Sequence, residues 1–473
     1  MDKSADRKLF LGARLRRLRR DLGLTQAAMS REVGVSASYL NLLERNQRPV
    51  TAQVLLRLAE TFDLDLRNLT ADDPASGVSG LSEVFSDPLF QDLGISRHEV
   101  AEMVDNAPAL AEGVMRLYQA FQDRGRAGAL GDDASIGALR VGVPSDWVRD
   151  FIQAQKNFFP ELEAAAEATY AALTKTDAGL SSALTERLQE VCRARVQIVP
   201  SEVLVGMVRR FDHHRRRLLI SDLLDSSGRL FALAYHLALL EHGDLINTLA
   251  DRANPPDRAV RSLLKVSLAN YLGAAIIMPY EGFHTAVEQT RYDLDRVCAR
   301  FGVSFEQACH RLTTLARPGT RGVPFFMLRL DAAGNISKRF AGTDFPFSRF
   351  GGACPRWNIH AAFRNAGRVL TQVVETPDGR RYFTIARTVR RAAQTWDEDA
   401  DLAIGLGCDL KHAGQLIYSR GLDLAAPAVT PIGPVCTLCE RPACPQRAAQ
   451  PVTRTLVVDE FTKAISAYPF APG

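Results

Sequence analysis

The chain has 473 residues, 46% of them hydrophobic and 24% charged, and its formal net charge is +4. This is the composition of an ordinary globular protein with room for about three domains. No N-terminal segment resembles a signal peptide and no apolar run reaches the length of a membrane span, so we expect a cytoplasmic protein. In such a protein eight cysteines argue against a disulfide framework.

Residues 1–70 have the pattern of a five-helix DNA-binding head. Leucines recur at helical spacing from Leu11 to Leu22 while arginines fill the other faces, which predicts a strongly basic first helix. Two short helices are expected on either side of Gly34, each preceded by a capping residue, Thr25 or Ser36. Two short helices around a glycine turn are typical of a helix-turn-helix.

Small, polar and aromatic side chains begin the second short helix, where they suit close approach to base edges. The segments LGARLRRLRR, GLTQAAMSREVGVSASYLNLLERNQRPV and LLRLAETFDLDLRNL resemble the Xre/Cro-like helix-turn-helix domain, and this resemblance implies that Gln26 braces a phosphate. The residues expected to contact a double-stranded DNA operator are Arg17, Gln26, Ser36, Ala37, Ser38, Tyr39, Asn41, Arg45 and Arg48.

A fourth helix over 51–62 and a short fifth helix around Leu66 complete the expected head. Turn-forming residues in 71–93 predict a linker, and the pattern over 94–195 is almost entirely helical. We expect this helical region to form a dimer contact, because one head buries little DNA whereas two heads about one helical turn apart read a paired site. The chain is therefore predicted to be a homodimer or a higher homo-oligomer.

The region 196–318 begins with two short predicted strands, at 196–199 and 217–220. A helix over 228–242 follows, and then a second helix that closes on the small-residue run 269–279. This order resembles the ImmA/IrrE metallopeptidase-like domain, in which the first of these helices carries the zinc-binding motif HExxH.

The motif is degenerate here. A zinc peptidase needs two histidines four residues apart, a glutamate beside the first, and a third ligand. His236 occupies the first position, but Leu237 replaces the glutamate and Leu240 replaces the second histidine. His242 points away from His236 because it lies six residues on. We therefore expect a peptidase fold without peptidase chemistry, so the chain is not an enzyme; an active metallopeptidase that cleaves a repressor is the alternative.

Residues 319–473 form the last predicted domain, after a helix over 304–315. Hairpins over 322–340 and 369–389, with a helix over 357–365, predict a small antiparallel sheet. The motifs RGVPFFMLRLDAAGNISKRF, FGGACPRWNIH, IGLGCDLKHAGQLIYSRGLDL and PIGPVCTLCERPACPQRA resemble the short-chain fatty acyl-CoA regulator family, and the resemblance spans the whole chain. It implies a transcription factor that senses a short-chain acyl-CoA, such as propionyl-CoA or acetyl-CoA, and controls genes of acyl-CoA metabolism.

An acyl-CoA pocket requires cations for the phosphates and a narrow apolar floor for the acyl end. Residues of both kinds lie close together in the sequence of the last domain, namely Phe325, Phe326, Lys338, Arg339, Phe347, Arg349, Arg356, Trp357 and His360. Arg209, Arg210 and the run 215–217 in the degenerate peptidase region are an alternative mouth for this pocket.

Three clustered cysteines, Cys436, Cys439 and Cys444, suggest a structural zinc site in a proline-bounded loop. Cys408 is the first choice for the fourth ligand and His412 the second. An iron–sulfur centre, a thiol redox sensor and plain free thiols remain alternatives, so a metal- or redox-switched regulator is the rival function. The expected fold class is multidomain and mainly α, with an α+β C-terminal part: a five-helix head, a helical and metallopeptidase-like middle, and an antiparallel-sheet sensor domain with the cysteine loop.

Overall fold

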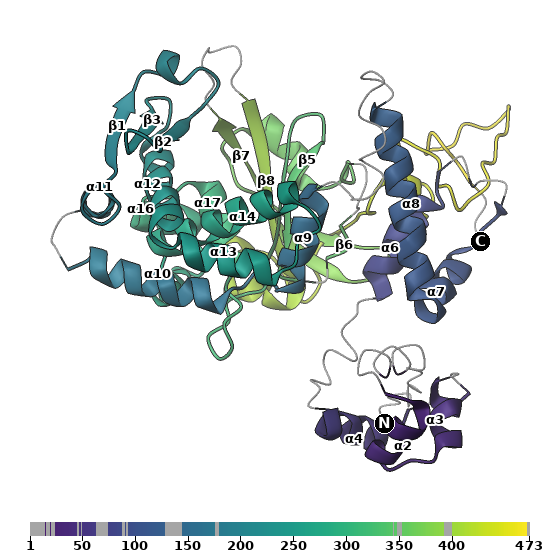
Figure 1. Cartoon of the computed structure of the whole chain (residues 1–473). Coiled ribbons are helices and arrows are strands. Elements are labelled where there is room, and N and C mark those ends of the chain that lie inside the picture. The colour runs from purple at the N-terminus through teal and green to yellow at the C-terminus, as the bar shows by residue number, and fades with distance from the viewer. Residues whose placement is uncertain are drawn as a thin grey trace. The chain divides into compact units, whose positions relative to one another are not determined.

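The computed structural model describes residues 15, 19, 24–44, 47–48, 50–62, 74–87, 90, 93–127, 144–175, 179–343, 345–347, 352–391 and 400–470 (Figure 1). These residues belong to two compact units, 1–121 and 122–473. The boundary between the units falls inside helix α8 (Pro108–Ala127), which is therefore shared between them.

The DNA-binding head lies in the first unit. Its described helices are α2 (Gln26–Val33), α3 (Ala37–Glu44) and α4 (Ala52–Phe62), which confirms the expected second, third and fourth helices. They close over a small apolar core made of Leu15, Met29, Val33, Leu40, Leu43, Val50, Val54 and Leu58. Leu15 and Arg19 are helical, whereas the rest of the expected first helix and the fifth helix around Leu66 lie outside the described residues.

The expected linker 71–93 is wrong, because α6 (Pro74–Val84) occupies half of it. Leu81 and Val84 of α6 are fully buried against α7 (Arg97–Asn106) and α8. A run of Pro, Ser and Gly has the composition of a loop, yet the apolar residues that follow supply enough contacts to hold a helix. The tertiary packing therefore overrides the weak local preference for a turn.

The second unit contains ten described α-helices. They are α9 (Pro144–Ala154), α10 (Pro160–Leu173), α11 (Leu180–Glu190), α12 (Ser226–Glu241), α13 (Gly243–Arg252), α14 (Arg258–Ile277), α15 (Tyr280–Gln289), α16 (Leu294–Phe301), α17 (Phe305–Leu312) and α18 (Asn358–Ala361). The helices expected from the sequence in this region are confirmed, with small changes in their ends.

The described strands of this unit form two sheets. The smaller sheet has the order β1-β3-β2, with β1 (Arg195–Val199) parallel and β2 (Arg209–Asp212) antiparallel to β3 (Arg217–Ser221). The larger sheet has the order β5-β4-β8-β7-β6-β9, and all of its neighbours are antiparallel except β6 and β9. Its strands are β4 (Phe326–Leu330), β5 (Ile336–Ala341), β6 (Leu370–Glu375), β7 (Arg381–Arg391), β8 (Ala400–Asp409) and β9 (Val429–Pro431).

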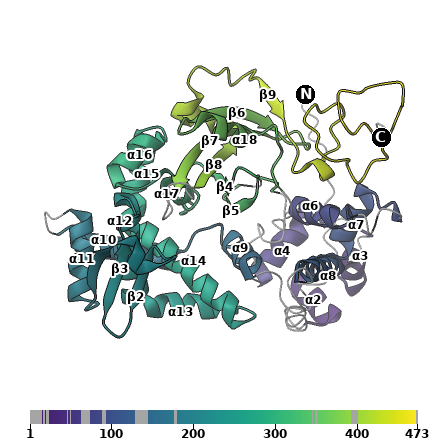
Figure 2. The ribbon, with the colours of Figure 1, turned by 90° about the horizontal axis from the view of Figure 1, so that it is seen from above.

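Both faces of the larger sheet are buried. Alternate residues of β7 and β8, such as Ile385 and Ile404, join one continuous core with helices α10 to α17, and Figure 2 shows α16 and α17 beside the green strands. The other face carries a second core around Phe326 and α18. The boundaries expected at 195/196 and 318/319 are therefore not boundaries between compact units, because α10, α11 and the sheet share one core.

Helix α14 crosses the middle of the second unit. Its composition and length would allow it to span a membrane, contrary to the expectation that no apolar run is long enough, but 61% of this apolar stretch is buried inside the protein. At Gly273 a Cβ atom would lie 3.0 Å from the backbone of Tyr235, so only glycine lets α14 approach α12 this closely. The apolar composition of α14 is thus explained by its central place in the core.

A fully buried ion pair connects three of these helices. Arg311 of α17 donates hydrogen bonds to both carboxylate oxygens of Glu163 on α10, at 2.6 and 2.8 Å, and each side chain is only 1% exposed. The Tyr271 hydroxyl of α14 donates to the same carboxylate at 2.5 Å, and Arg311 Nε donates to the carbonyl of Met278 at 3.0 Å. The carboxylate also raises the pKa of Arg311, so the guanidinium stays charged in this apolar setting.

We predict that Glu163→Ala lowers the free energy of unfolding of the second unit by about 3–5 kcal/mol, because it leaves the buried Arg311 guanidinium unpaired. Glu161→Ala on the same helix is the matched control, since Glu161 is 41% exposed and its pair with Arg252 contributes at most about 1 kcal/mol. Denaturant melts of both variants measure the difference. Equal losses in the two variants would contradict the prediction.

Candidate DNA interface and effector site

The first turn of α3 presents its side chains to solvent. Ser36 caps the helix by accepting a hydrogen bond from the backbone N–H of Tyr39 at 3.1 Å, and its hydroxyl lies 3.1 Å from that of Ser38. Ser36, Ala37 and Ser38 are exposed, whereas Leu40 one turn later is buried in the core of the head. The later part of α3 is thus packed in the core of the head while its first turn is accessible to solvent, as is required of a helix that reads bases in a DNA groove.

A buried carboxylate organises the other expected DNA contacts. Glu44, only 4% exposed, accepts hydrogen bonds from Arg19 at 2.6 and 3.2 Å and from the Gln26 side chain at 3.0 Å. The carboxylate raises the pKa of Arg19 and so favours its charged form. Gln26 also lies 3.5 Å from Asn41, so both side chains are oriented before any DNA arrives. Glu44 is not among the residues expected from the sequence, although a glutamate beside apolar helix positions such as Leu40 and Leu43 signals a buried carboxylate.

The remaining expected contacts are at the edges of the head. Tyr39 and Asn41 are half-buried, and Arg48 is exposed in the segment that follows α3. Arg17 and Arg45 lie outside the described residues. Behind the turn, Arg57 of α4 donates a hydrogen bond to the carbonyl of Gly34 at 3.2 Å, which links α4 to the turn between α2 and α3.

Helix α12 lacks the geometry of a zinc peptidase. His236 is 5% exposed and its Nδ1 lies 2.9 Å from the carbonyl of Ala232, one turn earlier on the same helix. Burial lowers the pKa of His236 to about 4, so the ring is neutral at ordinary pH. Leu237 is fully buried, and His242 instead pairs with Thr169 of α10 at 2.8 Å. His236 is thus a hydrogen-bonded core histidine.

The arginines beside this helix serve the packing of the small sheet. The Arg209 guanidinium lies 3.9 Å from the centroid of the Tyr235 ring, and burial lowers its pKa. Arg216 lies over the ring of Phe211 and donates to the carbonyl of Cys192. Arg210 and its neighbours Arg215 and Arg217 are exposed. Arg216 is exposed as well, but its guanidinium is engaged by the Phe211 ring and the Cys192 carbonyl, as that of Arg209 is by the Tyr235 ring, so neither of these two arginines is placed to line the mouth of a pocket.

The aromatic residues expected to floor a pocket in the sensor domain are core residues instead. Phe325 belongs to the core shared with the helices, whereas Phe326 points to the opposite face of the sheet. Phe326 stacks on Phe345 at 4.0 Å between ring centroids and also contacts Phe347 and Trp357. The cavity beside these rings is only about 20 Å³. Strand alternation therefore separates Phe325 from Phe326, Phe347 and Trp357, and the rings of these three leave little space beside them. The structure does not bring the expected aromatic residues together around one pocket.

The cations expected at the pocket mouth are also dispersed. Lys338 donates a hydrogen bond to the Glu306 carboxylate of α17 at 2.6 Å, and Arg339 also interacts with another group of the protein. Arg356 is half-buried and Arg349 lies outside the described residues. Burial lowers the pKa of His360, and its ring lies beside Gly334. These residues thus do not converge on a common anion site in the part of the chain that the structure describes.

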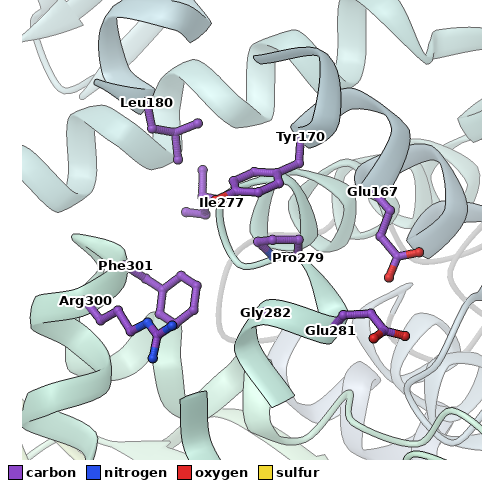
Figure 3. Close-up of a pocket in the computed structure, with 9 residues that line it drawn as sticks. All are labelled: Glu167, Tyr170, Leu180, Ile277, Pro279, Glu281, Gly282, Arg300 and Phe301. Carbon is purple, nitrogen blue, oxygen red and sulfur yellow. The ribbon is translucent and has the colours of Figure 1, made fainter. Parts of the chain in front are cut away.

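A much larger cavity, of about 570 Å³, lies among helices α10, α11, α14, α15 and α16. Figure 3 shows Tyr170, Ile277 and Pro279 in its middle, with further apolar groups from Leu180 and Phe301. Arg300 marks one side of the cavity, and the carboxylates of Glu167 and Glu281 mark the other (Figure 3). Its volume is typical of a small-molecule site, and its walls are predominantly apolar.

The charges around this cavity are partly balanced. Arg317 donates to Glu167 at 2.8 Å and to Glu281 at 3.3 Å, and its guanidinium lies 4.1 Å from the centroid of the Tyr280 ring. The two carboxylates are therefore partly neutralised by a cation behind them. Arg300 is exposed and free to meet an anionic group of a ligand within reach of the apolar walls.

The cysteine loop is held by arginines rather than by regular secondary structure. Arg447, 5% exposed, donates to the carbonyls of Cys436 and Cys439, at 3.2 and 2.9 Å, and Arg441 donates to that of Ile432 at 3.1 Å. Cys436, Cys439, Cys444 and a fourth cysteine, Cys354, line one cavity of about 10 Å³. As they stand, no three His, Cys, Asp or Glu side chains in the described ranges are close enough to hold a metal ion.

Cys408 is wrong as the fourth member of this cluster. It is fully buried in the core shared with the helices, with Ile404 and Leu406 on the same face of β8. Cys354 belongs to the core on the other face of the sheet, beside the loop. Because side chains alternate along a strand, β8 could not turn Cys408 toward the loop without losing its register. His412 is half-exposed and lies 3.3 Å from Gln415, so it does not join the cavity either.

Comparison with family models divides the chain into three matched segments. Residues 11–71 match a helix-turn-helix domain, residues 193–313 match the IrrE N-terminal-like domain, and residues 314–468 match the model described as short-chain fatty acyl coenzyme A regulator, C-terminal. The second and third segments meet where the structure has one continuous core.

Full-length relatives are also similar. The chain is 40% identical to the HTH-type transcriptional regulator RamB of Mycobacterium tuberculosis, with 98% of each chain covered. It is 38% identical to the HTH-type transcriptional regulator PrpR of the same species, with coverage of 98% of this chain and 96% of that one. The propionyl-CoA carboxylase regulator of Cereibacter sphaeroides is 39% identical, with 98% coverage of both. A solved Mycobacterium tuberculosis transcriptional regulator, 38% identical, superposes with a TM-score of 0.65 over 68% of this chain and 98% of that structure.

We predict that His236 makes the second unit less stable in acid. The folded pKa of about 4 lies below the unfolded value of about 6.5, so the stabilisation is complete above about pH 6.5 and is lost as the pH falls through 4. The full effect is on the order of 3 kcal/mol. His236→Asn keeps a donor for the Ala232 carbonyl but cannot titrate, so its melting temperature should fall less than that of the wild type between pH 7 and pH 4.5. Parallel losses in the two proteins would show that other groups cause the acid sensitivity.

Proposed function

Because the chain belongs to the short-chain fatty acyl-CoA regulator family, we propose that it is a transcriptional regulator that binds operator DNA and responds to a short-chain acyl-CoA ester. The observation that carries the DNA-binding half is the first turn of α3, where Ser36, Ala37 and Ser38 are exposed to solvent in a head whose core is closed. We keep Gln26 and Asn41 as proposed DNA contacts, and we propose that Glu44 orients Gln26 because its carboxylate accepts a hydrogen bond from the Gln26 side chain.

The name of one relative states that it regulates propionyl-CoA carboxylase, which supports propionyl-CoA or a similar ester as the effector and acyl-CoA metabolism as the regulated process. Peptidase activity is not part of the proposal. Leu237 and Leu240 occupy the positions of the general base and the second metal ligand, and His236 is committed to a backbone carbonyl.

We place the effector in the 570 Å³ cavity rather than among the aromatic residues of the sensor sheet. An acyl-pantetheine arm is long and thin, and its acyl, methylene and gem-dimethyl groups, which alternate with two amides, suit walls that include Leu180, Ile277 and Phe301. The CoA phosphates would meet Arg300 at one side of the cavity, since a guanidinium binds phosphate oxygens in pairs. Control of DNA binding then requires that the ester bind the operator-competent and operator-incompetent states with different affinities.

We predict that Arg300→Glu weakens propionyl-CoA binding at least tenfold, as expected when a charge-assisted contact of about 1.5–3 kcal/mol is replaced by repulsion. Arg296→Glu is the matched control, because Arg296 lies on the same helix, is largely exposed and does not line the cavity. Titration calorimetry measures the ester affinity. Fluorescence anisotropy on DNA selected with the wild-type protein measures operator affinity. The ester should change this affinity in the wild type and in Arg296→Glu, but not in Arg300→Glu.

If neither propionyl-CoA nor acetyl-CoA changes the operator affinity of the wild type, the effector half of the proposal fails. If the ester acts but Arg300→Glu and Arg296→Glu are indistinguishable, the effector binds elsewhere. Loss of operator binding with Arg300→Glu in the absence of ester would mean that the variant has damaged the protein rather than the effector site.

We propose further that the cysteine loop closes on a metal, with Cys354, Cys436, Cys439 and Cys444 as its ligands. Four thiolates suit a structural zinc ion, and an iron–sulfur centre is the alternative for the same ligand set. The support is the convergence of these four residues on one cavity and the packing of Gly433, where a Cβ atom would lie 2.6 Å from the Cys439 sulfur. A metal would join the loop, which follows β9, to the segment that precedes α18. A metal- or redox-switched regulator would use the same site.

We predict that Cys354→Ala removes the bound metal, whereas the matched control Cys408→Ala retains it. The wild type purified without chelators should hold about one zinc ion per chain by elemental analysis, or show the visible absorbance of an iron–sulfur centre. A metal-free wild type with no such absorbance would leave only free thiols. If Cys354→Ala keeps the metal and Cys408→Ala loses it, the fourth ligand is Cys408, as first expected from the sequence.

A further inference from the structure

Helix α8 has two apolar faces, and only one of them is covered. Ala111 and Met115 are buried against α6 and α7, and Tyr118 packs beside them. The other face carries Leu110, which is 65% exposed, Leu117, which is 71% exposed, and Phe121, which is 52% exposed. These are the large exposed apolar side chains of α8 in the described part of the chain.

The exposed residues follow the spacing of a helix-pairing seam. Leu110, Val114, Leu117 and Phe121 are separated by four, three and four residues, which is the heptad spacing of positions d and a. At about 100° per residue they fall on one stripe, next to the buried face and distinct from it. Val114 is half-buried at the edge of the covered core, so it connects the two faces.

The borders of this seam favour another helix as its occupant. Gly113 lies next to the stripe, and a Cβ atom there would meet nothing within 4 Å, so the backbone of a second helix could come close. The polar pair Glu112 and Arg116 is internal to α8, at 2.9 Å, and points away from the stripe. No charge on the described side chains therefore interrupts the apolar seam.

We propose that α8 pairs with α8 of a second copy of the chain, through Leu110, Val114, Leu117 and Phe121. The seam lies in the same compact unit as the DNA-binding head, so pairing there brings two heads together. The apolar core formed by α6, α7 and α8 is small, with Leu81, Val84, Val100, Ala111 and Met115 as its buried members. Apolar side chains of a second copy would enlarge this core. A stripe that pairs with itself gives a two-fold dimer, which matches a paired operator.

This inference rests on the proposed DNA-binding function, because the two heads explain why a self-pairing seam is needed. It also narrows the dimerisation region expected over 94–195. Helices α9, α10 and α11 of that region bury apolar residues in the core of the second unit, and α7 packs in the small core with α6. Among the described helices of 94–195, α8 is therefore the one that carries several large exposed apolar side chains.

The test uses the full chain with Leu117→Glu and the matched control Arg116→Ser on the same helix. Both positions are exposed, so neither variant should unfold the domain, and circular dichroism melts check this. Sedimentation velocity should show a dimer for the wild type and the control. Leu117→Glu should raise the dimer dissociation constant at least tenfold.

DNA binding distinguishes failure of this inference from failure of the proposed function. Leu117→Glu should lose at least tenfold in affinity for a paired site selected from random DNA with the wild-type protein, yet bind one half of that site as the wild type does. A wild type that is a monomer, or a dimer that Leu117→Glu leaves intact, overturns the α8 seam. A wild type that binds no selected DNA overturns the proposed function itself.

Discussion

The buried ion pair between Glu163 and Arg311 is the contact on which the second unit depends. It joins α10, α14 and α17 at one point, and an additional bond from Arg311 fixes the carbonyl of Met278. A buried pair of charges adds little stability compared with apolar residues of the same size, but its geometry is demanding. It therefore acts mainly by defining how the three helices fit together, and replacing either partner alone leaves a charge that the core cannot solvate.

The candidate effector cavity is built on this contact. Glu167 lies one turn beyond Glu163 on α10, and Pro279 follows Met278 directly, so two walls of the cavity begin at residues that the ion pair holds. Arg317 then connects the carboxylates of Glu167 and Glu281 across the cavity's rim. A ligand that moved α10 or α16 would have to act against a rigid network, and a small displacement could be carried into the shared core.

Helix α12, whose zinc-binding motif is degenerate, contributes its former metal-binding positions to the core of the second unit. Once Leu237 and Leu240 replaced polar residues, the face of α12 that would have held a hydrated metal could be buried. His236 remains, but its Nδ1 is paired with a carbonyl of its own helix, and burial keeps the ring neutral. Helix α12 thus packs as part of an apolar core that is continuous with the sheet.

The sequence by itself determined the elements whose local signals are strong. Capping residues and glycine turns located α2 and α3, the ligands missing from α12 argued against a zinc-peptidase site there, and the long motifs identified the family. The expected linker failed because α6 depends on partners that no local pattern shows, and the aromatic pocket failed because strand alternation sends Phe325 and Phe326 to opposite faces. Only the tertiary structure decided that Cys354 rather than Cys408 joins the cysteine loop, that the middle and last domains share one core, and that the large cavity lies among helices. These outcomes depend on contacts between residues far apart in the chain, and burial and register are properties of the packed whole.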